Sequence, residues 1–360
     1  MNSYESILLK SLSRMDKGHM HIELPGGKQL VIGNGAHIRA NIRIRDNAFY
    51  KRYILYGDIG LGEAYVDGLW DTDDIAGVIS WVLLNRDKAP DKTTPFWLNR
   101  ADHYHLNNDL FRLFLDPTMT WSAAYFQKDG MDLEEAQLAK YKRLCEQLKL
   151  SPTDHVLEIG SGWGGNAIYM AKNYGCRVTS VTISKEQYQL ASRRVKAAGL
   201  QQQVNIQLQD YRTLSGSFDK IVSVEMLEAV GHRYLDTYFQ KCHALLKQDG
   251  ILALQVITCP DCRYDSASLL PSVGAINAAV NRTGEMTLVD LKEMGLHYAA
   301  TLKLWFMQFN SRQEDVKRLG FDDRFIRKWN YYLCYCEAAF RMRNIHVMQL
   351  VYTRPNNWRH

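Results

Sequence analysis

The ten residues 156–165, Val-Leu-Glu-Ile-Gly-Ser-Gly-Trp-Gly-Gly, decide the fold of this chain. An apolar run ends beside an acid and then turns through glycines into a helix-like segment. A strand, a tight loop and a helix N-terminus in that order form a site for a nucleoside-bearing cofactor. The stretch therefore predicts where the chemistry lies, and it leaves two cofactor classes, a dinucleotide and S-adenosylmethionine.

The sequence that follows favours S-adenosylmethionine. Gly160, Gly162 and Gly165 match the dinucleotide pattern G-x-G-x-x-G, which also needs an acid at the end of the second strand. The expected second strand, residues 176–184, ends without one. Glu158 stands two residues before the first glycine, as in the E-x-G-x-G pattern of class I methyltransferases. A dinucleotide enzyme is the weaker interpretation, and glycines that merely turn the chain are the weakest.

Bulk properties predict a cytoplasmic protein. The chain has 360 residues, 46% of them hydrophobic, and a net charge of +5, which allows two domains or one large one. The mildly basic charge suits an anionic lipid surface or an ordinary solvated one, and no nucleic-acid partner is expected. The first 20 residues lack the apolar core of a signal peptide, and no apolar run is long enough to span a bilayer. The lone Cys259-x-x-Cys262 pair predicts no metal.

The pattern along the chain predicts an α/β fold, a doubly wound and mostly parallel sheet with a smaller α+β N-terminal domain. Strand–helix alternation begins near residue 131, which is the mark of such a sheet. We expect domains at 1–95 and 96–360, with a linker at 88–95. The expected strands of the second domain are 154–159, 176–182, 204–208, 219–224, 250–257 and 345–353. The expected helices include 46–56, 73–85, 132–150 and 325–343.

Several longer strings resemble one family, the cyclopropane-fatty-acid synthases, which include the mycolic acid cyclopropane synthases. Glycine loops are shared by all class I methyltransferases, whereas these strings are specific to the group. They lie at 60–70, 103–109, 115–122, 182–187, 225–231, 298–302 and 331–337. The resemblance covers most of the chain.

The resemblance implies a reaction. A methyl group passes from S-adenosylmethionine to the cis double bond of an unsaturated phospholipid acyl chain, and a carbocation forms. A bicarbonate ion bound in the site then removes a proton, and a cyclopropane ring closes. The implied protein is peripheral at the inner membrane surface. Its basic residues Arg43, Arg45, Lys51 and Arg52 are candidates for headgroup contacts, or are ordinary solvated charges. A homodimer is compatible with the family, but no stretch identifies an interface.

The resemblance also implies site residues. The expected donor-binding residues are Trp121, Ser122, Glu158, Gly160, Gly162, Thr182, Gln187, Asp210 and Tyr211. Thr182 and Gln187 belong near the ribose and methionine ends of the donor, and Asp210 with Tyr211 at the adenine. For the bicarbonate site, Glu228 matches the family glutamate that orients the anion. Tyr298 matches a hydroxyl donor, and Ile257 a backbone contact.

Three features depart from the family pattern. The family cysteine is Ala123 here, and the family histidine before Ile257 is Gln255. A backbone amide at Ala123 and the two N–H groups of Gln255 can still bind an oxyanion, but glutamine takes up no proton. Residues 266–269 replace a longer aromatic loop near the expected acyl entrance. Three outcomes therefore stay open: a cyclopropane synthase, an enzyme that makes methyl-branched or methylene fatty acids, and a catalytically silent protein that binds the donor or lipid. A small-molecule methyltransferase is less favoured, because it would not need the N-terminal domain.

Overall fold

The computed structural model describes residues 3–35, 38–88, 107–265 and 270–357, which form two compact units. The first unit comprises Met1–His105 and Leu302–Arg343, and the second comprises Leu106–Thr301 and Asn344–His360. Helix α10, Gly295–Ser311, begins in the second unit and continues into the first. The boundary predicted near residue 95 and the string 103–106 lie outside the described residues, as does the short segment 266–269.

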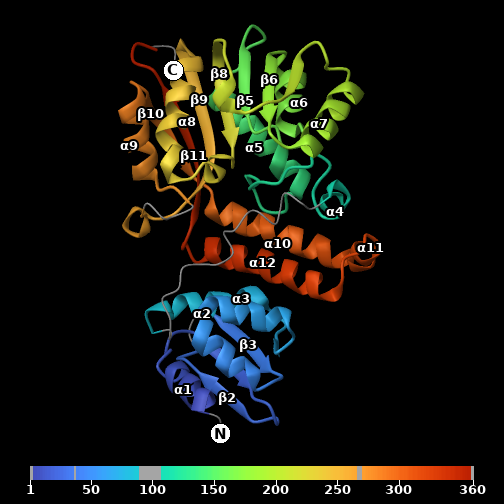
Figure 1. The fold of residues 1–360 in the computed structure, drawn as a ribbon, viewed down its shortest axis with the longest axis vertical. Helices are drawn as coiled ribbons and strands as arrows, with labels where there is room; N and C mark the ends of the chain where they lie inside the picture. The colour runs from blue at the N-terminus through green and yellow to red at the C-terminus, as the bar shows by residue number, and fades with distance from the viewer. Residues whose placement is uncertain (1–2, 36–37, 89–106, 266–269, 358–360) are drawn as a thin grey trace. The chain divides into compact units, whose positions relative to one another are not determined.

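The first unit holds a four-stranded sheet in the order β2-β1-β3-β4 (Figure 1). Its strands are β1 His19–Glu23, β2 Gln29–Ile32, β3 Arg39–Ile44 and β4 Trp70–Asp71. Its helices, besides the later part of α10, are α1 Ser3–Leu12, α2 Ala48–Val66, α3 Ile75–Leu84, α11 Gln313–Arg318 and α12 Asp323–Arg341. Every residue of α3 from Ile75 to Val82 is buried, because this helix is apolar on all sides.

Helix α12 completes the core of the first unit. Its buried residues Tyr331, Cys334, Tyr335 and Ala338 belong to the same hydrophobic cluster as residues of α2 and α3. The Arg327 guanidinium lies 4.1 Å from the ring centroid of Tyr65, and its Nη2 donates to Asp71 at 3.0 Å. The C-terminal segment 302–343 is therefore part of the N-terminal unit, which the sequence pattern did not indicate.

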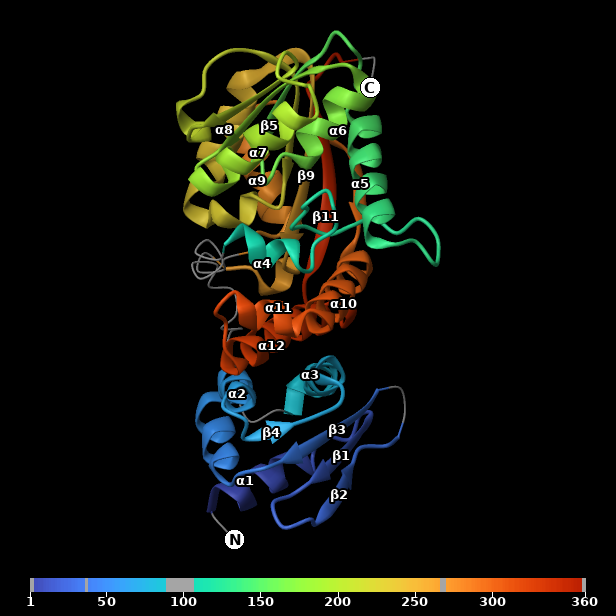
Figure 2. The ribbon, with the colours of Figure 1, turned by 90° about the vertical axis from the view of Figure 1, so that its right-hand side faces the viewer.

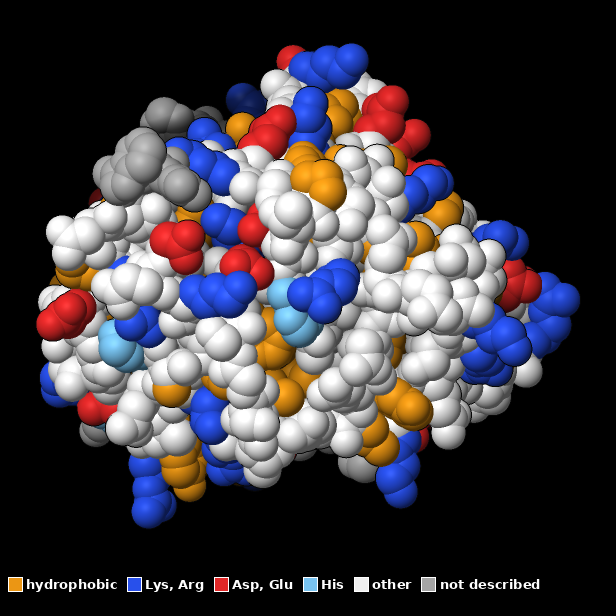
Figure 3. All heavy atoms as spheres, turned by 90° about the horizontal axis from the view of Figure 1, so that it is seen from above, with side chains coloured by type: hydrophobic (Ala, Val, Ile, Leu, Met, Phe, Trp, Pro, Cys, Tyr) orange, Lys and Arg blue, Asp and Glu red, His pale blue; other side chains and the backbone are white. Residues whose placement is uncertain are grey.

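Three of the four basic residues considered for headgroup contacts are paired with acids. Arg43 bonds Asp73 at 2.7 Å, Arg45 lies 3.7 Å from Asp71, and Arg52 pairs with Asp67. On the face seen in Figure 3, Lys and Arg side chains are interspersed with Asp and Glu. No helix among the described residues combines the length and apolar character needed to cross a membrane.

The second unit is built on a seven-stranded sheet in the order β10-β11-β9-β8-β5-β6-β7. Its strands are β5 His155–Ile159, β6 Arg177–Thr182, β7 Val204–Leu208, β8 Phe218–Val224, β9 Leu246–Thr258, β10 Thr287–Glu293 and β11 His346–Thr353. Strands β9, β8, β5, β6 and β7 run parallel, and β11 and β10 are antiparallel to their neighbours. The predicted doubly wound, mostly parallel fold is confirmed.

Helices cover both faces of this sheet. They are α5 Leu133–Gln147, α6 Gly165–Tyr174, α7 Lys185–Ala197, α8 Leu235–Leu245 and α9 Val273–Thr283, and the short helix α4 Asn108–Arg112 also belongs to this unit. Alternate residues of β5 point to opposite faces: Leu157 packs with residues of α8 and α9, and Val156 packs with α5 and α6. In Figure 2, α8 and α9 lie to the left of β9 and β11, and α5 and α6 lie to the right.

The order of strands reverses between β5 and its neighbour β8. In open α/β sheets, ligands bind outside the carboxyl ends of the strands at such a switch point. The carboxyl ends of β5, β6, β7, β8 and β9, together with the segments that follow them, carry most of the site residues predicted above. The fold therefore brings these parts of the sequence to one edge of the sheet.

Candidate active site

The glycine loop lies at the centre of this edge. Gly160 has a φ of 97°, and its N–H donates to the Val181 carbonyl of β6 at 3.0 Å. A Cβ added at Gly160 would lie 3.3 Å from Cβ and Cγ of Met226, which follows β8. At Gly165, the first residue of α6, a Cβ would come within 2.7 Å of the Thr118 carbonyl and the Tyr141 hydroxyl. The loop is therefore pressed closely between its neighbours, and only glycine fits these two positions without displacement.

Glu158 lies behind the glycine loop. Only 2% of Glu158 is exposed, and its carboxylate accepts hydrogen bonds from Asn166 Nδ2 at 2.9 Å and from the Ser180 hydroxyl. These bonds join β5, β6 and α6 beneath the loop. Burial raises the pKa of Glu158 from 4.5 to about 7. A direct contact of Glu158 with the donor stays a prediction.

The buried carboxyl of Glu158 should make stability pH-dependent. Its pKa is higher in the folded than in the unfolded chain, so the stabilisation from its protonation is complete below about pH 4.5 and is lost as the pH rises through about 7. Glu158→Gln keeps the shape and removes the titration. We compare the free energy of unfolding of the variant with that of the parent at about pH 5 and at about pH 8. The difference should shift in favour of the variant by about 3 kcal/mol from the lower to the higher pH.

Urea unfolding of both proteins at the two pH values measures this difference. Glu146→Gln, at a half-exposed position on α5, is the control and should show the same difference from the parent at both pH values. An unchanged difference for Glu158→Gln would contradict the buried titration.

The residues predicted near the ribose and methionine ends lie together at the end of β6. Thr182 Oγ1 donates to Gln187 Oε1 at 2.9 Å and accepts from the Ser184 N–H at 3.1 Å. Ser184 caps α7 by accepting from the Gln187 N–H at 3.3 Å. The turn thus presents polar side chains beside the glycine loop.

Asp210 and Tyr211 follow β7. Asp210 accepts from the Arg212 backbone N–H at 2.9 Å and from its guanidinium at 2.6 Å, and this hydrogen bonding lowers the pKa of Asp210. Tyr211 packs edge-to-face on Tyr238, with ring centroids 5.4 Å apart. The pair is therefore held in place independently of any ligand.

Trp121 and Ser122 lie in the segment that leads into α5. The Trp121 ring packs edge-to-face on Phe111 and Phe114, with centroid distances of 5.5 and 5.7 Å. The buried Ser122 hydroxyl accepts a hydrogen bond from Lys140 Nζ at 2.7 Å. Lys140 has no exposed surface, and burial lowers its pKa from 10.5 to about 7. Sequence reasoning missed Lys140.

Ala123 and Gln255 lie together and share one partner, Glu225. Glu225 Oε1 accepts from the Ala123 N–H at 2.8 Å and from Gln255 Nε2 at 2.9 Å. Gln255 Nε2 also donates to the Ala123 carbonyl at 3.1 Å, and Gln255 Oε1 accepts from Gln349 Nε2 at 2.9 Å. Arg143 extends the chain of bonds by donating to Gln349 at 2.9 Å. Sequence reasoning missed Glu225, although an acid at the carboxyl end of a parallel strand is a usable signal.

Glu228 and Ile257 are also joined directly. Glu228 is 5% exposed, and its Oε1 accepts from the Ile257 N–H at 2.7 Å. Glu228 lies on a short 3₁₀ turn, Leu227–Ala229, that follows β8. The structure thus brings Ala123, Gln255, Glu228 and Ile257 to the ends of β8 and β9.

Tyr298 lies early in α10 and is 6% exposed. The same helix, α10, also fixes the segment that follows Ala123 through two hydrogen bonds. The His297 ring accepts from the Phe126 N–H at 3.3 Å, and the Thr301 hydroxyl accepts from the Ala124 N–H at 3.0 Å. Tyr298 is therefore carried by a helix that is anchored beside the Ala123 segment.

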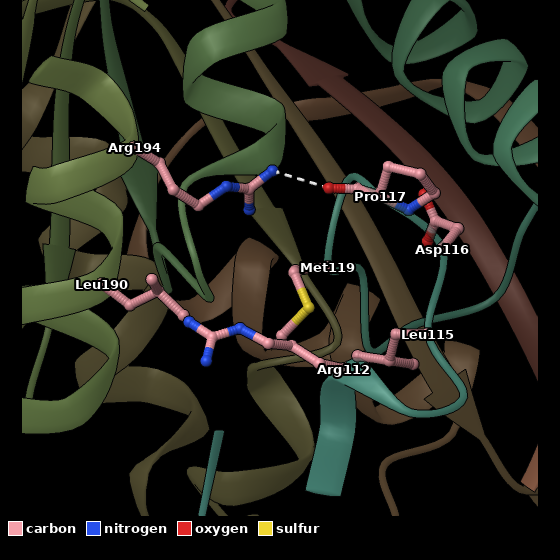
Figure 4. A pocket seen from close by; sticks show the side chains of 7 residues that line it. All are labelled: Arg112, Leu115, Asp116, Pro117, Met119, Leu190 and Arg194. Carbon is pink, nitrogen blue, oxygen red and sulfur yellow. Dashed lines mark hydrogen bonds between the residues drawn. The ribbon is translucent and has the colours of Figure 1, made fainter. Parts of the chain in front are cut away.

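A separate pocket of about 420 Å³ opens between α7 and the segment after α4. Figure 4 shows the residues that line it, Arg112, Leu115, Asp116, Pro117, Met119, Leu190 and Arg194. None of them is a predicted site residue. Arg194 donates to the carbonyls of Pro117 and Thr118 at 3.0 and 2.8 Å, so it fastens this segment to α7. Within the described residues, no group of three His, Cys, Asp or Glu side chains could hold a metal ion.

Comparison with known proteins identifies the family. Residues 91–350 match the mycolic acid cyclopropane synthetase family. The chain belongs to this family. It is 38% identical over 351 residues to the cyclopropane-fatty-acyl-phospholipid synthase of Escherichia coli, with 88% of each chain covered. It is 36% identical over 346 residues to a tuberculostearic acid methyltransferase of Mycobacterium tuberculosis, covering 85% of this chain and 81% of that protein.

The solved structures agree with the sequence comparisons. A mycolic acid cyclopropane synthase complexed with SAH and CTAB matches with a TM-score of 0.66 and 29% identity, over 73% of this chain and all of that one. The family resemblance inferred from the sequence is confirmed, and the chain is an S-adenosylmethionine-dependent C-methyltransferase. The roles of the individual site residues remain predictions.

Proposed function

We propose that this enzyme transfers a methyl group from S-adenosylmethionine to the cis double bond of an unsaturated phospholipid acyl chain and forms a cyclopropane fatty acid. The observation that carries the proposal is the contact between the glycine loop and the segment after β8. A Cβ at Gly160 would lie 3.3 Å from Met226, which stands between the acids Glu225 and Glu228. The donor loop and the acidic groups therefore share one site.

The residues present suit the donor. The loop offers backbone N–H groups near the N-terminus of α6, Thr182 and Gln187 offer polar groups for the ribose and methionine ends, and Tyr211 offers a ring for the adenine. Bound S-adenosylmethionine supplies an electrophilic methyl group on a sulfonium. The protein must hold the alkene in line with that methyl and exclude water that would trap the cation. Aromatic side chains such as the half-buried Trp121 suit the stabilisation of that cation.

The residues present do not suit a bound bicarbonate. Of the groups that the family resemblance assigns to this anion, the Ala123 N–H and the Gln255 amide already donate to Glu225, and the Ile257 N–H donates to Glu228. A bicarbonate would have to displace two carboxylates from these donors. The proposal therefore contains no step through bicarbonate.

An enzyme that forms methyl-branched or methylene fatty acids is the second candidate. It is supported by the relative named as a tuberculostearic acid methyltransferase, whose 36% identity nearly equals the 38% of the cyclopropane synthase. Loss of a proton after a hydride shift in the cation would leave a methylene group instead of a ring. The two products are isomers of equal mass, so NMR of the extracted lipid, not mass alone, distinguishes them.

The test uses donor labelled in its methyl group and vesicles of an unsaturated phospholipid, with fully saturated vesicles as the control. We expect label in the extracted unsaturated lipid and none in the saturated lipid. Label only in a soluble product would indicate a small-molecule methyltransferase, and donor binding without transfer would indicate a silent protein. Peripheral attachment at the inner membrane surface and a homodimer belong to the same proposal, and co-sedimentation with the vesicles and sedimentation velocity test them.

A further inference from the structure

The Glu225 carboxylate occupies the place that the family resemblance assigns to a bound anion. Its Oε1 accepts from the Ala123 N–H at 2.8 Å and from Gln255 Nε2 at 2.9 Å. Both donors are rigidly held. Gln255 is 1% exposed and its own oxygen accepts from Gln349, while the next amide along, that of Ala124, donates to Thr301 at 3.0 Å. Two preorganised N–H groups that converge on one carboxylate oxygen form an oxyanion site that is already filled by the chain itself.

A second anion at this place would be repelled. Glu225 and Glu228 are three residues apart in the segment after β8, and both accept bonds from groups assigned to the anion. Like charges in one small site disfavour one another, which lowers the affinity for a second anion. Bicarbonate therefore competes poorly against the internal carboxylate.

The backbone at Glu225 is held in a costly conformation. Its φ is 49°, in the left-handed region that side-chain-bearing residues rarely adopt. Such a conformation is unfavourable for a residue with a Cβ and persists only where the surrounding structure enforces it. The backbone turn follows directly from β8 and aims the Glu225 side chain at Ala123 and Gln255. A non-glycine residue in this conformation at the edge that holds the donor loop points to a functional constraint.

The charge of Glu225 has a nearby counterpart. Among the anionic side chains whose charges act on the buried Lys140, Glu225 has the largest effect, followed by Asp116 and Glu158. An ammonium close by favours the ionised form of a carboxylate. Glu225 is only partly buried, unlike Glu228 at 5% exposure.

We propose that Glu225 is the catalytic base of this enzyme and takes the role that bound bicarbonate has in the family. This inference rests on the proposed function. The alkene forms a new C–C bond to the methyl carbon, the S–C bond breaks, and its electron pair stays on the sulfur of S-adenosylhomocysteine. The Glu225 carboxylate then takes a proton from the new methyl group. The electrons of that C–H bond close the ring, or form a double bond if a hydride has first shifted. Glu225 becomes a carboxylic acid and returns the proton to solvent after the product leaves.

Two variants and a bicarbonate-free buffer test the assignment. Glu225→Gln keeps the shape but removes the base, and we expect the rate of lipid labelling to fall roughly 100-fold with or without bicarbonate. Glu225→Gly relieves the backbone strain and vacates both N–H donors, which opens the place to an external anion. We expect it to be as slow as Glu225→Gln in bicarbonate-free buffer and to recover at least about 10-fold when bicarbonate is added. The lipid-labelling rate of the parent enzyme should differ by less than about 2-fold between the buffers with and without bicarbonate.

The controls separate folding from catalysis. Glu134→Gln, an exposed acid on α5, should label lipid at the parent rate. Melting temperature and donor binding are measured for each variant, and Glu225→Gly covers the case in which Glu225→Gln misfolds. The assignment is overturned if the parent loses its activity when bicarbonate is removed, or if folded Glu225→Gln labels lipid at the parent rate. A parent enzyme that labels no lipid in either buffer overturns the proposed function itself.

Discussion

Replacing Gly160 with valine is expected to lower the affinity for S-adenosylmethionine by roughly 100-fold or more, with the protein still folded. Two costs add at this position. The φ of 97° strains any residue with a Cβ, by roughly 1–2 kcal/mol. A Cβ would also lie 3.3 Å from Met226, and the added methyl groups of valine would force the loop or Met226 to move at a cost of roughly 1–3 kcal/mol. The loop relieves the backbone strain and the contact with Met226 by leaving the conformation that binds the donor.

Isothermal titration with the donor measures the loss, and circular dichroism checks that the variant is folded. Gly199→Ala is the matched control, because Gly199 has a φ of 70° and nothing within 4 Å of an added Cβ. It carries the same kind of backbone strain, after the end of α7, without a neighbour to displace. We expect it to lose about 1 kcal/mol of stability and no donor affinity. Parent-like affinity in Gly160→Val would show that the donor does not depend on this loop.

The sheet and the donor loop could be predicted because their signals are local. A buried parallel strand is a short apolar run, as in β5, and a loop that must turn sharply shows its glycines directly. Strand β10, Thr287–Glu293, was missed because its alternating residues at the sheet edge are half-exposed and carry charges. Helix α12 was predicted within two residues at each end, but its place in the first unit depends on packing against α2 and α3. Packing between segments far apart in sequence leaves no local pattern.

The chemistry of the site was harder to predict for a related reason. Glu225 and Glu228 stand in one short string, and only Glu228 was singled out, because the resemblance assigns it a role. What distinguishes Glu225 is a backbone φ of 49° and two donors from residues 102 and 30 positions away. Neither the backbone conformation nor the pair of hydrogen-bond donors can be read from residue types. Lys140 was likewise hidden, since a lysine on an amphipathic helix is normally assigned to the solvent face.

Lys140 is expected to be the residue that orients Ser122 toward the donor. Its ammonium can only donate, so the Ser122 oxygen accepts and the Ser122 proton must point elsewhere. A hydroxyl fixed as a donor suits the carboxylate of the methionine part of S-adenosylmethionine. Lys140→Met removes both the orienting bond and the positive charge that faces Glu225, Asp116 and Glu158. We expect the donor to bind roughly 30-fold more weakly near pH 6, because loss of a buried charge partner costs about 2 kcal/mol or more.

The pH dependence of binding tests the same role independently. Burial lowers the pKa of Lys140 to about 7, so its charge is present below that pH and is lost above it. Because the charged form attracts the donor carboxylate, donor affinity of the parent should fall as the pH rises above about 7. Lys140→Met should lack that fall, while Lys142→Met, on an exposed position of α5, should keep it. A parent affinity that stays constant between about pH 6 and about pH 9, or a Lys140→Met protein with parent affinity, would leave Lys140 as a structural lysine only. If the expected result is obtained, the buried ammonium serves both sides of the site, because it orients a donor-binding hydroxyl and carries the charge that faces Glu225.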